Sequence, residues 1–316
     1  MPETVTIIGA TGIQGGSVLA SLYDSPDKYR LRGVTRNIDS DRVKELRAQF
    51  PSVEWVSADN SDPESLCQAF KDTDIVFANT NYISPEILAQ IDAGDLDAEF
   101  KQGKNIVDAA IAVGVKHIVY SSLESPSKGS NGKHANVYEL EGKNKIEQYV
   151  RSQSDKIKGY FVYAGFYYQN LVVSATWTTT INSDGVEVPT VRFSFPLPED
   201  AKVPHVDIER DLGNAVRLIV DNREEYEGKI VAAVGEVCTP GEITEAYTRI
   251  TGVPAVYVND KFPDFDRPEI YAMMDYFVEF GGYNVPNVVG GRDVSPRPFV
   301  TVDQFWKNHS DFRPPQ

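Results

Sequence analysis

Three glycines near the start of the chain constrain its fold more than any other feature. A β-branched run at residues 5–8 ends in Gly9, and Gly12 and Gly15 follow at three-residue spacing. An amphipathic stretch then begins at Val18. In a strand–turn–helix unit, the first glycine permits a tight exit from the strand, and the second lets the backbone approach a phosphate. The third allows the helix to pack closely on the strand, and the N-terminus of that helix attracts an anion. The chain is therefore expected to begin with a dinucleotide-binding turn.

Strand-like and helix-like segments alternate regularly through the first half of the chain. Short, nearly continuous apolar segments occur at 30–35, 53–58, 74–79, 117–122 and 159–163. Helical patterns separate them, and strands of this kind are typical of a parallel sheet covered on both faces. We therefore predict an α/β fold with a Rossmann-like, doubly wound parallel sheet. In such sheets ligands bind at the carboxyl ends of the strands, so the residues at those ends are candidates for the site.

The regular alternation breaks after residue 165, where short β-like segments and several prolines follow. A helix at 207–221 and a strand at 229–234 are predicted to return to the sheet. Further helical patterns occur at 268–280 and after Thr301, which begins a capping box. The later part of the chain is therefore expected to supply a second, smaller unit of mixed α+β structure.

These patterns predict two units built from interleaved parts of the chain. Residues 1–165, together with about 206–236, are expected to form the dinucleotide-binding domain. Residues 166–205 and 237–316 are expected to form the smaller C-terminal lobe, which would bind the substrate or a partner.

Composition and charge argue against several classes of protein. The 316-residue chain has a formal net charge of −15 and no Lys/Arg-rich run, which argues against direct nucleic-acid binding. No apolar segment is long enough to span a bilayer, so no membrane association is expected, and no secretory leader is recognised. Cys67 and Cys238 are far apart, and the four histidines are scattered, so neither a disulfide framework nor a metal site is predicted. We expect a cytoplasmic protein, or a nuclear one if it is a regulator.

The end of the second strand selects between NAD(H) and NADP(H). An NAD-binding site needs a carboxylate there to bind the ribose hydroxyls, whereas this chain has Thr35-Arg36-Asn37. The Arg36 guanidinium can bind a 2′-phosphate bidentately, which a carboxylate would repel. The competing carboxylate, Asp39, lies near a predicted helix start, where capping explains it. NADP(H) is therefore the expected cofactor, with Arg36 and Asn37 at its 2′-phosphate end.

With these residues in place, the chain resembles the NmrA-like proteins, a branch of the atypical short-chain dehydrogenase/reductase superfamily. The motifs that carry the resemblance are Gly9–Gly15, Val34–Asn37, Asn79–Tyr82, Phe100–Lys104, Val119–Ser121, Leu123–Glu124, Gly142–Lys143, Gly165–Tyr167, Asn170–Leu171 and Thr301–Trp306. They extend over nearly the whole chain. The resemblance implies a two-lobed protein that binds NADP(H) in the cleft between its lobes and often forms a homodimer.

The resemblance also implies roles for individual residues. The residues expected on the pyrophosphate are Gly9, Thr11, Gly12, Gln14 and Gly15. Those expected at the adenosine end are Arg36 on the 2′-phosphate and Asp59 and Asn60 near adenine. Those expected along the middle of the cofactor and at the nicotinamide ribose are Thr80, Asn81, Tyr82 and Lys143. Those expected to border the nicotinamide are Gly165, Phe166 and Tyr167, with Ser121 beside the cofactor at the end of its strand.

The residues expected to assist catalysis are Lys143 and Tyr167. Reductases of the wider superfamily pair a tyrosine acid with a lysine four residues later on one helix face. Here Tyr138 precedes Lys143 by five residues, which turns it by about 100° on a helix. Glu139 occupies the position four residues before the lysine. Tyr138 would reach the site only from a loop before the helix.

Other side chains near the predicted site have simpler explanations. Tyr168 is expected to pack in the interior rather than act as an acid. Ser121 and Ser122 are expected to form hydrogen bonds to the cofactor or the local backbone. His205 is expected at the surface or at an interface. The aromatic side chains of the smaller lobe suit a flat or apolar substrate, although core packing explains most of them. They are Trp177, Phe193, Phe195, Phe262, Phe265, Tyr271, Tyr276 and Phe277.

Two functions remain open from the sequence. The first is an oxidoreductase that transfers a hydride from NADPH to a small organic carbonyl, imine or enone. The second is a regulatory protein without turnover that senses NADP(H) and binds a protein partner according to cofactor state. The resemblance does not decide between them, because it covers both enzymes that use the lysine alone and non-catalytic sensors.

Overall fold

A parallel sheet of eight strands forms the larger part of the molecule, in the order β14-β11-β6-β5-β4-β1-β2-β3. The computed structural model describes residues 1–262, 266–283 and 288–315. The strands of this sheet are β1 (Glu3–Ile8), β2 (Tyr29–Thr35), β3 (Glu54–Ser57), β4 (Ile75–Ala78), β5 (His117–Ser122), β6 (Lys158–Ala164), β11 (Ile230–Ala233) and β14 (Val288–Gly290). All the neighbouring strands pair in parallel. The order runs outward in both directions from β1 and β4, so the predicted doubly wound fold is confirmed.

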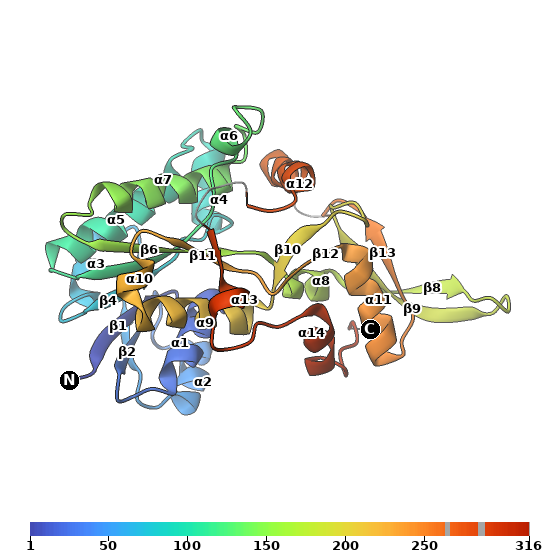
Figure 1. Cartoon of the computed structure of the whole chain (residues 1–316), viewed down its shortest axis with the longest axis horizontal. Coiled ribbons are helices and arrows are strands. Elements are labelled where there is room, and N and C mark those ends of the chain that lie inside the picture. Colours follow the sequence, from blue (N-terminus) through green and yellow to red (C-terminus); the bar gives the residue numbers. More distant parts are fainter. Residues whose placement is uncertain (263–265, 284–287, 316) are drawn as a thin grey trace.

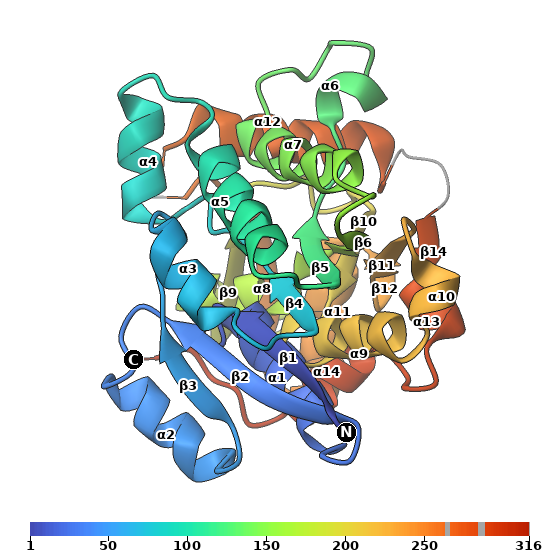
Figure 2. The same cartoon turned by 90° about the vertical axis from the view of Figure 1, so that its left-hand side faces the viewer.

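Helices cover both faces of the sheet (Figures 1 and 2). Those on one face are α1 (Ile13–Tyr23), α2 (Asp41–Gln49) and α9 (Ile208–Asp221), and those on the other are α3 (Pro63–Ala69), α5 (Ala98–Ala112) and α7 (Tyr138–Ser152). Successive side chains of a strand point to opposite faces. In β1, Val5 and Ile7 therefore pack with the first set of helices, whereas Ile8 packs with the second. This double burial explains why the strands are apolar along nearly their whole length.

Small residues allow α9 to return to the sheet beside α1. A Cβ atom at Gly213 would lie 2.1 Å from the carbonyl oxygen of Ser17. The backbone N–H of Gly213 donates a hydrogen bond to Ser17 Oγ at 2.9 Å. The predicted helix at 207–221 and strand at 229–234 thus correspond to α9 and β11, and both belong to the large domain.

The smaller lobe contains two sheets of three strands, ordered β12-β10-β7 and β13-β9-β8. Its strands are β7 (Phe166–Tyr167), β8 (Thr176–Ile181), β9 (Glu187–Phe195), β10 (Val203–Val206), β12 (Glu236–Cys238) and β13 (Ala255–Asn259). Its helices are α8 (Tyr168–Ser174), α11 (Pro240–Thr251), α12 (Pro268–Phe280) and α14 (Val302–Asn308). A separate apolar cluster, which includes Phe193, Tyr247 and Trp306, fills this lobe. The hairpin of β8 and β9 projects away from the rest of the molecule (Figure 1).

One segment departs from the predicted division of the chain. Residues 237–316 were assigned to the smaller lobe, but β14 within that range pairs with β11 at the edge of the large sheet. A strand of three residues, Val288–Gly290, is too short to show a periodic pattern in the sequence.

The remaining short helices are α4 (Pro85–Asp92), α6 (Pro126–Gly129), α10 (Arg223–Tyr226) and α13 (Gly291–Val294). In the described part of the chain, no helix combines the length and apolar character needed to cross a bilayer.

Candidate functional site

A cavity of about 1670 Å³ lies at the carboxyl ends of the sheet strands and is lined by residues of both lobes. The large domain contributes Gly9 after β1 and Arg36 after β2, and the smaller lobe contributes Phe195 of β9. All the predicted cofactor residues except Gly15 and Asn37 line this cavity. It opens at the switch in strand order between β1 and β4, which is where doubly wound sheets bind their ligands.

The glycine turn lies beside the start of α1 and lines the cavity. Gly9 has a φ of 64°, and the N–H of Gly12 donates to the carbonyl oxygen of Gly9 at 2.8 Å. A Cβ atom at Gly15 would lie 2.3 Å from that same oxygen, so this glycine serves close packing of the helix rather than contact with the cavity. No side chain caps α1, whose first residues Ile13 and Gln14 line the cavity. The N–H groups of the first helical turn have no intrahelical partners, so the turn fits a dinucleotide pyrophosphate.

An exposed ion pair lies at the end of the cavity beyond β2. Arg36 Nη1 is 3.0 Å from Glu86 Oε1, which comes from the first turn of α4. A hydrogen bond from its own backbone and the Arg36 guanidinium hold the pKa of Glu86 below its ordinary value. Asp59 and Asn60 line the same end. Asn37 instead accepts a hydrogen bond from the N–H two residues later at 3.0 Å, so it stabilises a local turn.

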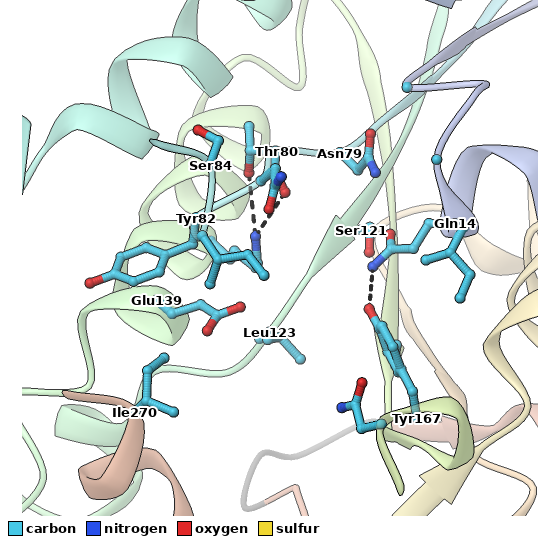
Figure 3. A pocket seen from close by; sticks show the side chains of 18 of the residues that line it. Gln14, Asn79, Thr80, Tyr82, Ser84, Ser121, Leu123, Glu139, Tyr167 and Ile270 are labelled. Carbon is cyan, nitrogen blue, oxygen red and sulfur yellow. Dashed lines mark hydrogen bonds between the residues drawn. The ribbon is translucent and has the colours of Figure 1, made fainter. Parts of the chain in front are cut away.

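A buried ion pair lies at the other end of the cavity. Lys143 Nζ is 2.5 Å from Glu99 Oε1 and donates to the carbonyl oxygen of Thr80 at 3.1 Å. The Thr80 hydroxyl donates to Glu99 Oε1 at 2.7 Å and lies 3.1 Å from the Tyr120 hydroxyl. The side chains of Lys143 and Glu99 are only 10% and 2% exposed. This network joins β5, α5 and α7 to the segment that follows β4 and holds the lysine ammonium at the edge of the cavity. Figure 3 shows Thr80 at this edge.

Two glycines allow α5 and α7 to approach closely enough for this pair. A Cβ atom at Gly142 would lie 2.8 Å from Glu99 Oε2, and one at Gly103 would lie 2.3 Å from Ile146 Cδ1. The Gly142-Lys143 sequence therefore has a steric explanation, because the residue before the lysine must leave room for the partner carboxylate.

The charges around Lys143 keep it protonated. Burial disfavours the ammonium, but the negative charge of Glu99 outweighs it, and Tyr120 and Glu139 add to the effect, so the pKa of Lys143 lies above its ordinary value. Burial likewise raises the pKa of Tyr120. The lysine is therefore a fixed positive charge at this end of the cavity.

Tyr167 lies across the cavity from Lys143 and is held by the glycine-turn helix. Gln14 Nε2 donates to the Tyr167 hydroxyl at 2.7 Å (Figure 3). Burial raises the pKa of Tyr167, against the opposing effects of Gln14 and Lys143. The hydroxyl is thus neutral near pH 7 and bridges the two lobes above the start of α1.

An apolar wall faces the same end of the cavity. Its residues on α12 are Ile270, Met273, Met274 and Phe277. Among the aromatic side chains considered from the sequence, Phe195, Phe262 and Phe277 line the cavity, Trp177, Phe193, Tyr271 and Tyr276 do not, and Phe265 lies outside the described residues. The buried members of the second group, Phe193 and Tyr276, pack in the core of the lobe.

The weaker candidates lie mostly away from the cavity. Tyr138 is the first residue of α7 rather than part of a preceding loop, and it does not line the cavity. Tyr168 and His205 are buried and stacked on each other. Burial lowers the pKa of His205 to about 4. Ser122 lines the cavity and donates to the carbonyl oxygens of Leu123 and Lys143, both at 3.3 Å.

Three carboxylates of the site were not predicted from the sequence, namely Glu86, Glu99 and Glu139. Nothing local in the sequence around Glu86 and Glu99 indicates their basic partners. Glu139 has a detectable signal, because it precedes Lys143 by four residues and must share its helix face. Within the described ranges, no group of three or more His, Cys, Asp or Glu side chains is placed to hold a metal ion.

Comparisons with known proteins agree with this architecture. The model of the NmrA-like family matches residues 1–313. The chain is 32% identical over 279 residues to the NmrA-like family domain-containing oxidoreductase lnbB of Aspergillus flavus, covering 85% of this chain and 80% of the relative. It is 31% identical over 343 residues to the oxidoreductase notA of an Aspergillus species, covering 97% of each chain.

The solved structure of NmrA, a negative transcriptional regulator, is similar in fold. Its complex with NAD has a TM-score of 0.75 and 21% identity, covering 97% of this chain and 94% of that chain. Its complex with NADP has a TM-score of 0.70 and 22% identity, covering 99% and 93%. At this level of identity, the likeness shows the fold alone.

Proposed function

The chain belongs to the NmrA-like family, and on that premise we propose that it binds NADP(H) along the cavity and catalyses the reduction of a small organic carbonyl, imine or enone. When bound, NADPH supplies the hydride. The observation that carries the proposal is the arrangement of charges in one cavity that the glycine turn lines. A basic residue, Arg36, lies at one end and a buried ammonium, Lys143, at the other.

NADP(H) is proposed over NAD(H) because of the residue that follows β2. Arg36 lies at the cavity end beyond β2, where its guanidinium can bind a 2′-phosphate with two hydrogen bonds. Its partner Glu86 is exposed, and an exposed ion pair has little net stability, so a phosphate can displace it. Related proteins are named in complexes with either dinucleotide, which supports the class of cofactor but not this choice.

Lys143 and Tyr167 are proposed to orient the reacting end of the cofactor. Lys143 can donate to ribose hydroxyls because Glu99 and Thr80 hold its ammonium at the cavity edge. Tyr167 and Gln14 hold one another across the cavity, so both can border the nicotinamide. The apolar wall of α12 can exclude water and hold a flat or apolar substrate.

The experiment that tests this function is NADPH oxidation against a panel of ketones, imines, quinones and enones, followed by the loss of NADPH absorbance. Binding of NADPH and NADH is measured in parallel by fluorescence titration. We expect tight NADPH binding and turnover of at least one class of apolar acceptor. Tight binding without any turnover would contradict the enzymatic function.

A second candidate function is a sensor that binds a protein partner according to its NADP(H) state. The observation that favours it is the absence of the tyrosine–lysine pair, since Tyr138 does not line the cavity and Glu139 occupies the tyrosine position. The structurally similar NmrA is named as a negative transcriptional regulator. The sensor becomes the better explanation if NADPH binds and the acceptor panel gives no oxidation.

A further inference from the structure

We propose that Glu139 is the proton donor of this site and takes the place of the tyrosine used by related reductases. The inference deepens the proposed reductase function and rests on it.

Glu139 shares a helix face with Lys143. It lies in the first turn of α7, four residues before the lysine, and residues at this spacing are neighbours on the helix surface. Both residues line the cavity. Figure 3 shows the Glu139 carboxyl directed into the cavity between Tyr82 and Ile270, on the side that faces Tyr167.

The surroundings of Glu139 are apolar enough to favour its protonated form. Its side chain is half-buried beside Leu123 and the apolar wall of α12. Among the described residues, no hydrogen bond holds its carboxylate, in contrast to Glu141 two residues later. Glu141 accepts hydrogen bonds from Ser125 Oγ and from the N–H of Ser127 outside the cavity.

Charged groups face Glu139 from three helices. Lys143 lies on α7 itself, Glu99 on α5 and Glu269 on α12, and the phenols of Tyr82 and Tyr167 are also near. Burial raises the pKa of Glu139, Lys143 opposes the rise, and the two other carboxylates add to it, so the pKa reaches about 7. A carboxyl with this pKa can give up a proton and regain it from water at neutral pH.

The other candidate acids are less suited to proton transfer. The Lys143 ammonium is held by Glu99 at 2.5 Å, and its pKa lies above the ordinary value, so it is a weak acid. The Tyr167 hydroxyl accepts a hydrogen bond from Gln14, and burial raises its pKa. Both side chains remain suited to orienting the cofactor, and Glu139 is the better proton donor.

The proposed step balances with the cofactor chemistry. As the carbonyl carbon accepts the hydride that NADPH supplies, the π electron pair moves to the carbonyl oxygen. The O–H bond of Glu139 breaks, and its proton forms the hydroxyl of the alcohol product. Glu139 is left as a carboxylate that Lys143 stabilises electrostatically, and it regains a proton from water. With an imine the proton goes to nitrogen instead.

The test compares the wild type with Glu139→Gln, which keeps the size and hydrogen-bonding ability of the side chain but has no acidic proton. We expect kcat with the best acceptor of the panel to fall by roughly 10²- to 10⁴-fold, as for other general acids. The KM for NADPH should change little, because Glu139 is not expected to hold the cofactor. Wild-type kcat should decrease as the pH rises through about 7, whereas the residual kcat of the variant should not decrease in this pH range.

A second readout needs neither cofactor nor turnover. Infrared difference spectroscopy of the cofactor-free protein should show a protonated carboxyl band that disappears as the pH is raised through about 7. Burial also raises the pKa of Asp211 to about 7, so this carboxyl contributes a band of its own. The part of the band that belongs to Glu139 should be lost in Glu139→Gln and kept in Glu141→Gln, a matched control on the same helix turn. Glu141→Gln should also keep its kcat, and circular dichroism should show that both variants are folded.

Three results separate the proposals. Turnover by the wild type with an unchanged kcat in Glu139→Gln overturns the role of Glu139 and leaves the reductase function standing. A Glu139 carboxyl band that titrates below pH 5 also overturns it. NADPH binding without turnover of any acceptor overturns the reductase function and the proton donor together.

Discussion

Two ion pairs at opposite ends of one cavity differ chiefly in burial. Lys143 and Glu99 are 10% and 2% exposed, whereas Arg36 and Glu86 are 66% and 53% exposed. The two separations are similar, 2.5 Å and 3.0 Å. The buried pair is part of a network with Thr80, whereas both partners of the exposed pair are largely accessible to solvent.

Burial decides what each pair can do. In the interior, a broken ion pair leaves an uncompensated charge, so the buried partners hold each other permanently. At the surface, water and salt replace most of the interaction, so the partners exchange readily. The buried pair therefore fixes a positive charge where the reaction is proposed to occur. The exposed pair keeps an arginine available for an anionic ligand.

The largest effect is expected from Lys143→Met, which removes the positive partner of the buried pair. Glu99 would remain in the interior without its counter-charge, so the free energy of unfolding should fall by about 3–5 kcal/mol. Urea denaturation followed by circular dichroism measures this loss. The matched variant at the exposed end, Arg36→Met, should unfold at nearly the same urea concentration as the wild type.

The double variant Lys143→Met/Glu99→Leu sharpens this contrast. It removes both buried charges, so it should recover a large part of the stability lost in the single variant. Equal urea midpoints for Lys143→Met and Arg36→Met would show that burial does not distinguish the two pairs.

Arg36→Ala should have the next largest effect, on cofactor choice rather than stability. Removal of charge-assisted hydrogen bonds to a 2′-phosphate, worth about 1.5–3 kcal/mol, should weaken NADPH binding roughly 10- to 150-fold. NADH, which lacks that phosphate, should bind nearly as before. Calorimetric titration of both cofactors measures the ratio, and an equal loss for NADPH and NADH would refute the assignment of Arg36.

The two ends also differ in how far the sequence predicts them. The glycine turn and Arg36 were predicted because each belongs to a local pattern at a strand end, whereas Lys143 was predicted because the resemblance to the NmrA-like proteins implies its role. The partner of Lys143 was not found, because Glu99 is 44 residues away and meets it only through the packing of α5 on α7. Such a contact depends on tertiary structure, which a one-dimensional pattern does not contain.

The same limit applies to the fold. The parallel sheet was predictable because its strands are apolar on both faces and alternate with helices. The strand β14 was assigned to the wrong unit because its three residues carry no period, and only pairing with β11 reveals it. The predicted site residue Asn37 lies next to Arg36 in sequence, yet its side chain stabilises a turn outside the cavity.

The free energy of unfolding should depend on pH with opposite signs at the two ends of the cavity, where Glu139 and Glu86 lie. Burial raises the pKa of Glu139 from 4.5 to about 7, so the folded protein binds more protons than the unfolded chain between these values. The contribution of Glu139 to the free energy of unfolding should therefore fall as the pH rises from 4.5 to 7, by on the order of 1–3 kcal/mol.

The measurement is the difference in urea-derived stability between the wild type and Glu139→Gln at several pH values. At the exposed end, the pKa of Glu86 is lowered, so its stabilisation is present above its unfolded-state pKa and is lost as the pH falls. Glu86→Gln should therefore give a difference of opposite sign and smaller size. A difference for Glu139→Gln that does not vary with pH in this interval would contradict a raised pKa.

The smallest effect is expected from Glu86→Gln on NADPH affinity. Glu86 competes with a bound 2′-phosphate for the Arg36 guanidinium and also repels the phosphate. Its removal should strengthen NADPH binding roughly two- to fivefold, because an exposed pair holds its partner weakly. The gain should shrink as salt is added, because salt screens exposed charges. Fluorescence titration at low and physiological ionic strength measures it, with NADH as the ligand that should not respond.

Glu45→Gln, which changes an exposed carboxylate on α2 outside the cavity, is the control for loss of negative charge. Weaker NADPH binding in Glu86→Gln would show that this carboxylate positions Arg36 for the phosphate rather than competing with it.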